Sequence, residues 1–374
     1  MSTLHFEGSN CLRQRLILSV LTGKPIRVSN IRTKDDEPGI AEYEANLFKL
    51  IEKVTNGTVI TIDETGSEFE FKPGLLFGGK VDHDCGLDRC ISYYLEVLLV
   101  FAPFFKKPIE ATLKGITNDQ IDFCVDSLKN SALPVIKMFL GYIDDNDLEI
   151  KVVSRGVKPN GGGCVSFKCP IRRVLKPIQM IEQGKVKRIR GVAFATRVSP
   201  QMANRMVEVA KGILLEFIPD IYIYTDHLKG KNSGKSPGFG LSLVAETTNG
   251  VFYTGEAMSN PLGSEPSVPE DIAKKAAHAL LDEIFRGGCV DSTNQGLALL
   301  FMGLGQTDLS KLMIGPPSPY TIQLLRHMKE FLQITFKLDS VNSKDSKSEY
   351  KIGGQKIIAT CIGVGFSNLS KTIS

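Results

Sequence analysis

The sequence lacks any apolar run long enough to cross a membrane. The longest, EVLLVFAPFF at 96–105, is about half of the roughly 20 residues that a spanning helix needs. No hydrophobic segment follows the start MSTLHFEGSN, and the eight cysteines are spread along the chain. We therefore expect no membrane association, a reducing compartment, free thiols and no disulfide framework.

Histidine is also scarce, with only five residues, and none pairs with a nearby Ser or Cys at a readable spacing. His83, Cys85 and Cys90 in DHDCGLDRC are of metal-binding types. A structural zinc site needs four ligands, however, and the sequence has no partner Cys-x-x-Cys or His-x-His. We therefore expect neither a metal nor a cofactor.

The overall charge balance does not show whether the protein binds nucleic acid. The 45 Lys and Arg against 41 Asp and Glu give a formal net charge of +4, which is compatible with nucleic-acid binding but common in proteins that bind none. The 374 residues, 42% of them hydrophobic, are enough for two packed units of ordinary globular composition.

The same order of elements occurs three times along the chain. Helical periodicity and end signals predict a pair of helices in each unit, at 10–23 and 39–57, at 91–105 and 118–140, and from 292 and at 318–333. Segments that alternate like strands accompany each pair. We predict an α+β body of three repeated units, each with two helices and a four-stranded sheet.

The second interval between first helices is about twice the first, because these helices begin near 10, 91 and 292. Residues 184–283 fill the excess with a strand, a helix, further strands and a second helix. We predict a small α+β domain inserted before the third unit. The expected domains are 1–183 (units one and two), 184–283 (the insertion) and 284–374 (unit three).

Two glycine-rich segments resemble phosphate-binding loops without matching them. GKNSGKS (230–236) has three residues between its glycines where a P-loop needs four, and a strand-like segment follows it, so we interpret it as a hairpin loop. PNGGGCVSF (159–167) has no helix after it to hold a phosphate. Its glycines are more typical of a close backbone crossing than of a ligand site.

The strongest local charge lies between 168 and 190. One acid, Glu182, stands against eight cations: Lys168, Arg172, Arg173, Lys176, Lys185, Lys187, Arg188 and Arg190. Such a segment favours phosphate, and we take Arg172, Arg173, Lys187 and Arg188 as candidates for RNA contact. A solvated connector, or a nuclear-import signal in KVKRIR (185–190), is the alternative.

Two more basic pairs are candidates for binding an anion. Arg13 and Arg15 follow Gly8, Ser9 and Asn10, where free backbone donors and guanidinium groups would hold a phosphate together. Arg326 and Lys329 lie one turn apart on a predicted helix. If the helix starts near Asn10 and Ser292 open onto one cleft, Arg13 would bind an anion there, with Asp291 near the same pocket.

The chain resembles the RNA 3'-terminal phosphate cyclase superfamily over essentially its whole length. The segments that carry the resemblance are EGSNCLRQRLILSVLTGKPIRVSNIR, PGI at 38–40, PNGGG, FATRVSPQMANRM and SGKSPGFGLSLVAET, and the last two point to the eukaryotic cyclase-like branch. The resemblance implies three α+β repeats with an inserted small domain.

The resemblance also bears on activity. The cyclases are adenylated on a histidine a few residues before a DQ pair, and matching this pair to Asn294-Gln295 places the histidine at Asp291. A carboxylate cannot form the stable phosphoramidate, so we expect no cyclase activity. The stretch Ser292–Gln295 is then predicted to be an S-x-x-Q capping box on a buried helix.

The cyclase-like branch implies a nucleolar factor of the small-subunit processome, needed for early pre-rRNA cleavage and bound to pre-rRNA and a large ribosome-assembly GTPase. The alternative is a metal-independent pre-rRNA endonuclease. The residues proposed for cleavage in this branch match Arg326, His327 and Lys329, with His in place of the branch's Asp. A histidine base and two cations are suited to that reaction.

Overall fold

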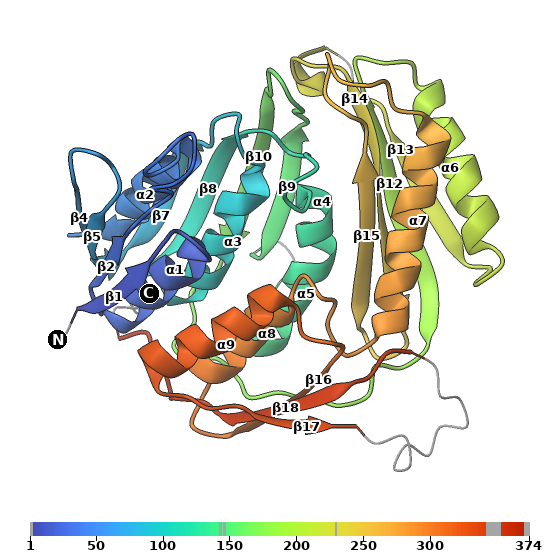
Figure 1. Cartoon of the computed structure of the whole chain (residues 1–374). Coiled ribbons are helices and arrows are strands. Elements are labelled where there is room, and N and C mark those ends of the chain that lie inside the picture. The colour runs from blue at the N-terminus through green and yellow to red at the C-terminus, as the bar shows by residue number, and fades with distance from the viewer. Residues whose placement is uncertain (1–2, 142–143, 145–146, 229, 342–352, 370–374) are drawn as a thin grey trace.

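Four mixed β-sheets of four strands each, with helices packed on them, make up the computed structural model (Figure 1). The structure describes residues 3–141, 144, 147–228, 230–341 and 353–369. Within these residues no helix is long and apolar enough to cross a lipid bilayer. The chain is therefore a mixed α and β protein, as its alternating periodicities predict.

The first sheet and its helices come from the N-terminal part of the chain. They are β1 (Leu4–Glu7), α1 (Leu12–Thr22), β2 (Ile26–Ser29), α2 (Glu42–Val54), β4 (Val59–Ile62) and β5 (Phe69–Lys72), with a small ribbon of β3 (Thr55–Asn56) and β6 (Leu75–Leu76). The second sheet follows with β7 (Gly78–Asp84), α3 (Ile91–Phe101), η1 (Ala102–Phe104), β8 (Lys107–Gly115), α4 (Val125–Ser127), η2 (Leu128–Ala132), α5 (Leu133–Leu140), β9 (Glu149–Ser154) and β10 (Gly163–Cys169).

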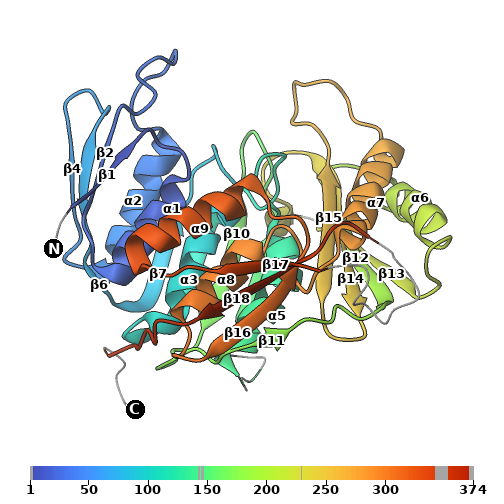
Figure 2. The same ribbon diagram turned by 60° about the horizontal axis from the view of Figure 1, so that its bottom comes forward.

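The other two sheets are interleaved along the chain. The third contains β11 (Gln179–Met180), α8 (Gln295–Leu304), β16 (Leu309–Ile314), α9 (Pro319–Leu332), β17 (Lys337–Ser340) and β18 (Ile357–Ile362). The fourth contains β12 (Val186–Thr196), α6 (Gln201–Leu214), β13 (Ile221–Asp226), η3 (Gly230–Ser233), β14 (Gly238–Thr247), β15 (Phe252–Met258) and α7 (Pro269–Arg286). Figure 2 shows the third sheet lying across α8.

The first three sheets have one strand order, in which each sheet's first, second, fourth and third strands are neighbours. In each of them the first two strands are parallel and the other pairs are antiparallel. Strand β11 precedes the fourth sheet in sequence, yet it pairs with β16. The fourth sheet therefore lies, in sequence, between the first and second strands of the third sheet.

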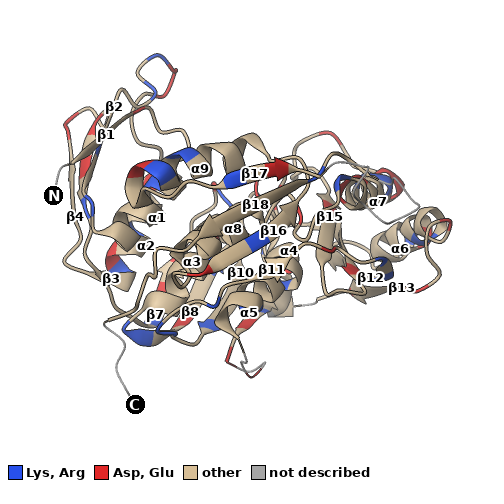
Figure 3. Ribbon diagram, turned by 90° about the horizontal axis from the view of Figure 1, so that it is seen from below, with Lys and Arg blue, Asp and Glu red and all other residues tan. Residues whose placement is uncertain are grey.

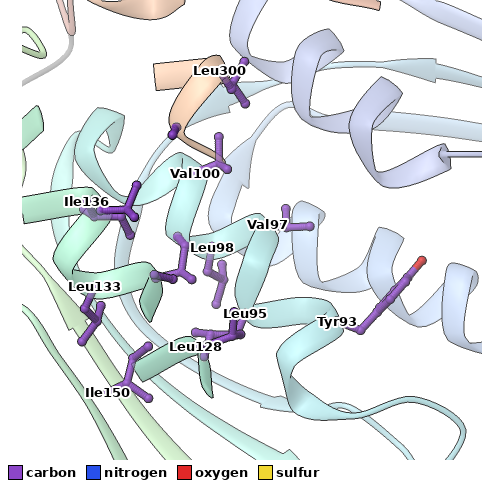
Figure 4. Close-up of a cluster of buried hydrophobic side chains, with 14 of the residues drawn as sticks. Tyr93, Leu95, Val97, Leu98, Val100, Leu128, Leu133, Ile136, Ile150 and Leu300 are labelled. Atoms are coloured by element: carbon purple, nitrogen blue, oxygen red, sulfur yellow. The ribbon is translucent and has the colours of Figure 1, made fainter. Parts of the chain in front are cut away.

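The core lies where helices of different sheets meet. Helix α3 has apolar residues all round and is buried on every side but that of Glu96, which is typical of a central helix. Figure 4 shows side chains of α3 packed with those of η2, α5 and α8, among them Leu98, Leu128, Ile136 and Leu300. This shared core brings the start of α8 close to residues from the rest of the chain.

The predicted helix at 118–140 is wrong in its first third. Residues 118–124 form a loop, and the helical segment begins at Val125 with a π-helical turn at 128–132. Asp119 explains the difference, because its Oδ1 accepts hydrogen bonds from the backbone N–H groups of Ile121 and Asp122. This local turn competes with the helix for the same backbone donors.

Candidate functional site

The site that the sequence singles out lies at the start of α8, in the turn that follows α7. Asp291 is 2% exposed, and its carboxylate is fully engaged. Oδ1 accepts from the backbone N–H of Asn294 at 3.0 Å and from its side-chain Nδ2 at 2.7 Å, and Oδ2 accepts from Thr254 Oγ1 at 2.8 Å. Thr254 belongs to β15, so Asp291 connects the third and fourth sheets.

Burial raises the pKa of Asp291 to about 6, although the hydrogen bonds from Thr254 and Asn294 act in the opposite direction. Asn294 extends the connection, because its Nδ2 also donates to Ser131 Oγ of η2 at 2.8 Å. The position of the expected nucleophile is thus connected directly to strand β15 and, through Asn294, to η2. The sequence gives no local signal for Thr254 or Ser131, since both partners are distant along the chain.

The predicted capping box at Ser292–Gln295 is wrong. Helix α8 begins at Gln295, and Asn294 makes no side-chain capping bond. Ser292 Oγ instead donates to Glu283 of α7 at 2.7 Å, and Gln295 Oε1 accepts from Thr321 of α9. The carboxylate of Asp291, three residues before Asn294, accepts the hydrogen bonds of this turn. The side chains of Ser292 and Gln295 therefore bond to other helices.

Residues of α1 and of the start of α8 line one cavity, but neither Asn10 nor Ser292 is among them, and the cavity is small and apolar. Its volume is about 60 Å³, against roughly 300–1,000 Å³ for typical ligand pockets. Gln14 and Asn294 are among its lining residues, together with Leu99, Leu300 and Leu324. Asn294 of this turn therefore lines the cavity, whereas Asp291 is not among the lining residues.

Arg13 is held by the protein itself. Its Nη1 lies 2.7 Å from Glu96 Oε2 and donates to the backbone oxygen of Tyr93 at 3.2 Å. The guanidinium also stands 4.3 Å from the centroid of the Tyr93 ring, a cation–π distance. The anion-binding role of Arg13 remains a prediction, and the structure gives its charge a carboxylate partner.

Arg15 and His327 form a buried hydrogen-bonded contact between α1 and α9. Arg15 Nη1 donates to Gly8 O at 2.7 Å, and its Nε lies 3.4 Å from His327 Nε2. His327 is 2% exposed, and its Nδ1 lies 3.0 Å from Gln14 Oε1. Burial, and then the charge of Arg15, lower the pKa of His327 to about 4. A neutral imidazole donates from Nδ1 to Gln14 and accepts at Nε2, which is consistent with these contacts.

The structure separates the three nuclease candidates. Arg326 and Lys329 lie on the exposed side of α9, where Arg326 Nη1 donates to Gln323 Oε1 at 3.4 Å. His327 faces the opposite way into the contact with α1. The helical spacing of the three residues explains this, because neighbours in sequence point to different sides of a helix.

The basic segment at 168–190 is divided between two parts of the molecule. Arg172 and Arg173 lie on the connector after β10, where Arg172 Nε donates to Leu140 O at 3.2 Å. Lys187 and Arg188 lie on β12, and both contact Glu246 of β14. Figure 3 shows basic and acidic residues interspersed along the ribbon. RNA contact by Arg172, Arg173, Lys187 and Arg188 remains a prediction.

The two glycine-rich segments pack against each other. Lys235 N donates to Gly161 O at 2.9 Å, and a Cβ on Gly234 would stand 2.3 Å from Arg155 O, so the glycines permit a close backbone crossing as expected. The hairpin interpretation of 230–236 is wrong, because β12 lies between β13 and β14 and both pair with it. Within the described residues no group of three His, Cys, Asp or Glu side chains is placed to hold a metal ion.

A second polar network, which the sequence analysis missed, joins the second and fourth sheets. Arg155, 2% exposed, contacts Asp126 of α4 through Nη1 at 2.7 Å and through Nη2 at 3.1 Å. Its Nε contacts Asp226 of β13 at 2.7 Å. The guanidinium lies 4.9 Å from the centroid of the Phe194 ring. The three partners of Arg155 come from segments distant in the sequence, so no sequence motif predicts the network.

Comparisons with known proteins agree with these features. The family model of RNA 3'-terminal phosphate cyclase matches residues 4–338. The human RNA 3'-terminal phosphate cyclase-like protein is 57% identical over 372 residues, which cover 99% of this chain and 98% of the human one. A probable RNA 3'-terminal phosphate cyclase-like protein of Drosophila melanogaster is 49% identical over 375 residues, covering 99% of this chain and 97% of its own. The rRNA processing protein rcl1 of Schizosaccharomyces pombe is 39% identical over 371 residues, which cover 98% of each chain. The chain therefore belongs to the RNA 3'-terminal phosphate cyclase family, in its eukaryotic cyclase-like branch.

Proposed function

We propose that this protein is a ribosome biogenesis factor that acts in rRNA processing by binding and not by cyclising RNA ends. The observation that carries the proposal is the state of Asp291. A side chain that must attack a nucleotide phosphorus needs a free, accessible atom, whereas both oxygens of Asp291 accept hydrogen bonds and the residue is 2% exposed. The printed name of the fission-yeast relative supports the role in rRNA processing.

The proposal includes a place and partners. We place the protein in the nucleolus, in the small-subunit processome, where it binds pre-rRNA and a large ribosome-assembly GTPase and is needed for early cleavage of the precursor. The 57% and 39% identity to the human and fission-yeast relatives over nearly the whole chain supports a shared role. Co-purification of the tagged protein with the GTPase from nucleolar extract tests the partner directly.

The repeat organisation belongs to the same proposal. The common strand order of the first, second and third sheets supports three related units, with the fourth sheet and its two helices as the inserted domain. In this interpretation β11 is the first strand of unit three, and the insertion falls between that strand and α8. The boundaries near 184 and 283 remain predictions.

The endonuclease alternative finds no specific support in the geometry. His327 is neutral at neutral pH, which suits a base, but both ring nitrogens are engaged by neighbouring side chains. Arg326 and Lys329 lie on the other side of α9 and are not placed to steady a phosphate beside it. A binding role requires no such convergence of groups.

Incubation with ATP labelled on its α-phosphate, in the presence of magnesium, tests the absence of cyclase chemistry. We expect no covalent label on the purified protein, because Asp291 cannot form a stable phosphoramidate and is closed by its three donors. An active RNA 3'-terminal phosphate cyclase treated in parallel is the positive control. Label that survives denaturation and is lost in Asp291→Asn would overturn the proposal.

A further inference from the structure

Among the residues that the structure describes, none covers one face of the fourth sheet beside β13. Helices α6 and α7 pack on the other face, α6 against β12 and β13 and α7 against β14 and β15. Because side chains alternate along a strand, Ile223 points toward α6 and is 6% exposed, whereas Tyr222 and Tyr224 point to the open side. Figure 1 shows both helices on the same side of this sheet.

The two tyrosines form an exposed aromatic pair. Tyr222 is 51% exposed and Tyr224 is 58% exposed, and their ring centroids lie 4.5 Å apart at an interplanar angle of 83°. Their cross-strand neighbours on β12 are Arg190 and Val192. Exposed aromatic rings held on a sheet offer apolar surface on which a planar ligand can stack.

Cations surround this pair in excess over acids. The register shift of β12 between Val186 and Arg188 brings both Lys187 and Arg188 onto Glu246, at 2.9 and 2.6 Å. Arg190 pairs with Asp220 at 2.8 Å. With exposed Lys185 and exposed Glu182, the four cations of this edge stand against three carboxylates, an excess of one positive charge. We call Tyr222, Tyr224, Lys187, Arg188 and Arg190 the tyrosine face.

The remainder of the same sheet face is already occupied. Glu256 of β15 bonds the backbone N–H of Cys124 at 2.9 Å, and Ser242 of β14 lies 3.2 Å from Ser127 through their hydroxyl oxygens. Arg155 closes the far end of β13 at Asp226. The tyrosine face is therefore the part of this sheet that the second sheet and its helices leave uncovered.

We infer that the tyrosine face binds single-stranded RNA by stacking bases on Tyr222 and Tyr224. Single-strand binding surfaces combine aromatic rings, on which bases stack without sequence preference, with cations that follow the backbone. Double-stranded RNA keeps its bases inside the helix and offers no such faces. The inference rests on the proposed role in rRNA processing and assigns its RNA contact to one surface, chosen by chemistry and charge.

The composition of the chain allows RNA binding to be followed by tyrosine fluorescence. The protein has nine tyrosines and no tryptophan, so its fluorescence comes from tyrosine. Titration of the full-length protein with a short labelled single-stranded RNA is followed by anisotropy of the label and by tyrosine emission. We expect binding to quench part of the tyrosine emission, and a duplex of the same composition to bind more weakly.

Two paired variants separate stacking from other effects. Tyr222→Ala with Tyr224→Ala is expected to weaken binding by about tenfold or more, with an unchanged salt dependence, because stacking and not charge is lost. Tyr222→Phe with Tyr224→Phe retains the rings, so affinity is expected to be kept while the quenching falls. Phe285→Ala removes another exposed ring, 60% exposed on α7, and serves as the matched control with unchanged affinity.

Each result decides the inference. If the wild-type protein binds no RNA, the proposed RNA role itself fails. If it binds RNA and the paired alanine variant binds equally well, the proposed function stands and the tyrosine face is rejected. If that variant keeps its RNA affinity but loses co-purifying protein partners, the face is a protein-docking surface and the inference is again overturned.

Discussion

At the scale of single residues, the position of the expected nucleophile has a structural role. Asp291 accepts hydrogen bonds from Thr254 and Asn294, and Asn294 in turn binds Ser131, so one carboxylate connects strand β15, the start of α8 and η2. Burial makes the charged form of this carboxylate unfavourable, which is why its pKa rises to about 6. The hydrogen bonds of Asp291 order the turn, whereas its buried negative charge destabilises the folded state.

Asp291→Asn tests this description through the pH dependence of stability. The pKa of Asp291 is about 6 in the folded state against an ordinary 3.8, so the folded protein loses stability as pH rises from about 4 to 6 and the penalty is complete above that range. Two pKa units correspond to about 3 kcal/mol. The free energy of unfolding of the variant, relative to wild type, is expected to rise by about this amount across the window.

Urea unfolding of both proteins at several pH values measures this difference. Other titrating groups contribute equally to the two proteins and cancel in the subtraction. A difference that is the same at every pH would mean that the carboxyl group titrates normally and that the buried hydrogen-bonded description of Asp291 is wrong.

At the scale of elements, the junction between the second and fourth sheets depends on one guanidinium. Arg155 bonds Asp126 of α4 and Asp226 of β13 while it lies over Phe194. Arg155→Met is expected to destabilise the protein by about 3–5 kcal/mol, because it leaves the buried carboxylate of Asp126 unpaired. Thermal or urea unfolding measures the loss.

Arg205→Met provides the matched control. Arg205 makes a similar two-point contact with Glu270, at 2.6 and 2.8 Å, but both side chains are well exposed. Exposed ion pairs contribute about 0–1 kcal/mol, so this variant is expected to unfold almost like wild type. Equal losses for the two variants would show that burial does not distinguish the Arg155 network.

The elements also show where sequence patterns end. Apolar periodicity located α2 and α9 to within a few residues, since each buries one face along a single helix. It failed at 118–124, where Asp119 binds nearby backbone donors, and at Ser292–Gln295, where other helices take the capping side chains. These outcomes depend on side-chain hydrogen bonds, which apolar periodicity does not predict.

At the scale of the whole molecule, the sequence predicted the α+β class and the order of the elements, but not how distant segments meet. The pairing of β11 with β16 spans the whole fourth sheet, and two residues are too short to be recognised as a strand. The contact of Arg13 with Glu96 likewise joins separate helices. Sequence analysis thus placed Asp291 just before α8, while the side chains that bind its carboxylate were found only in the structure.

If the protein acts in rRNA processing as a binding factor, the residues proposed for cyclisation and for cleavage are dispensable, and one measurement in cells tests this. Cells depleted of the protein are supplied with a variant carrying Asp291→Asn, Arg326→Ala and Lys329→Ala, and pre-rRNA intermediates are quantified by hybridisation. Arg326 and Lys329 are exposed and Asn is close in shape to Asp, so the variant is expected to fold. We expect this variant to restore early pre-rRNA cleavage as wild type does. Accumulation of uncleaved precursor, with the variant present at normal level and folded, would contradict this expectation.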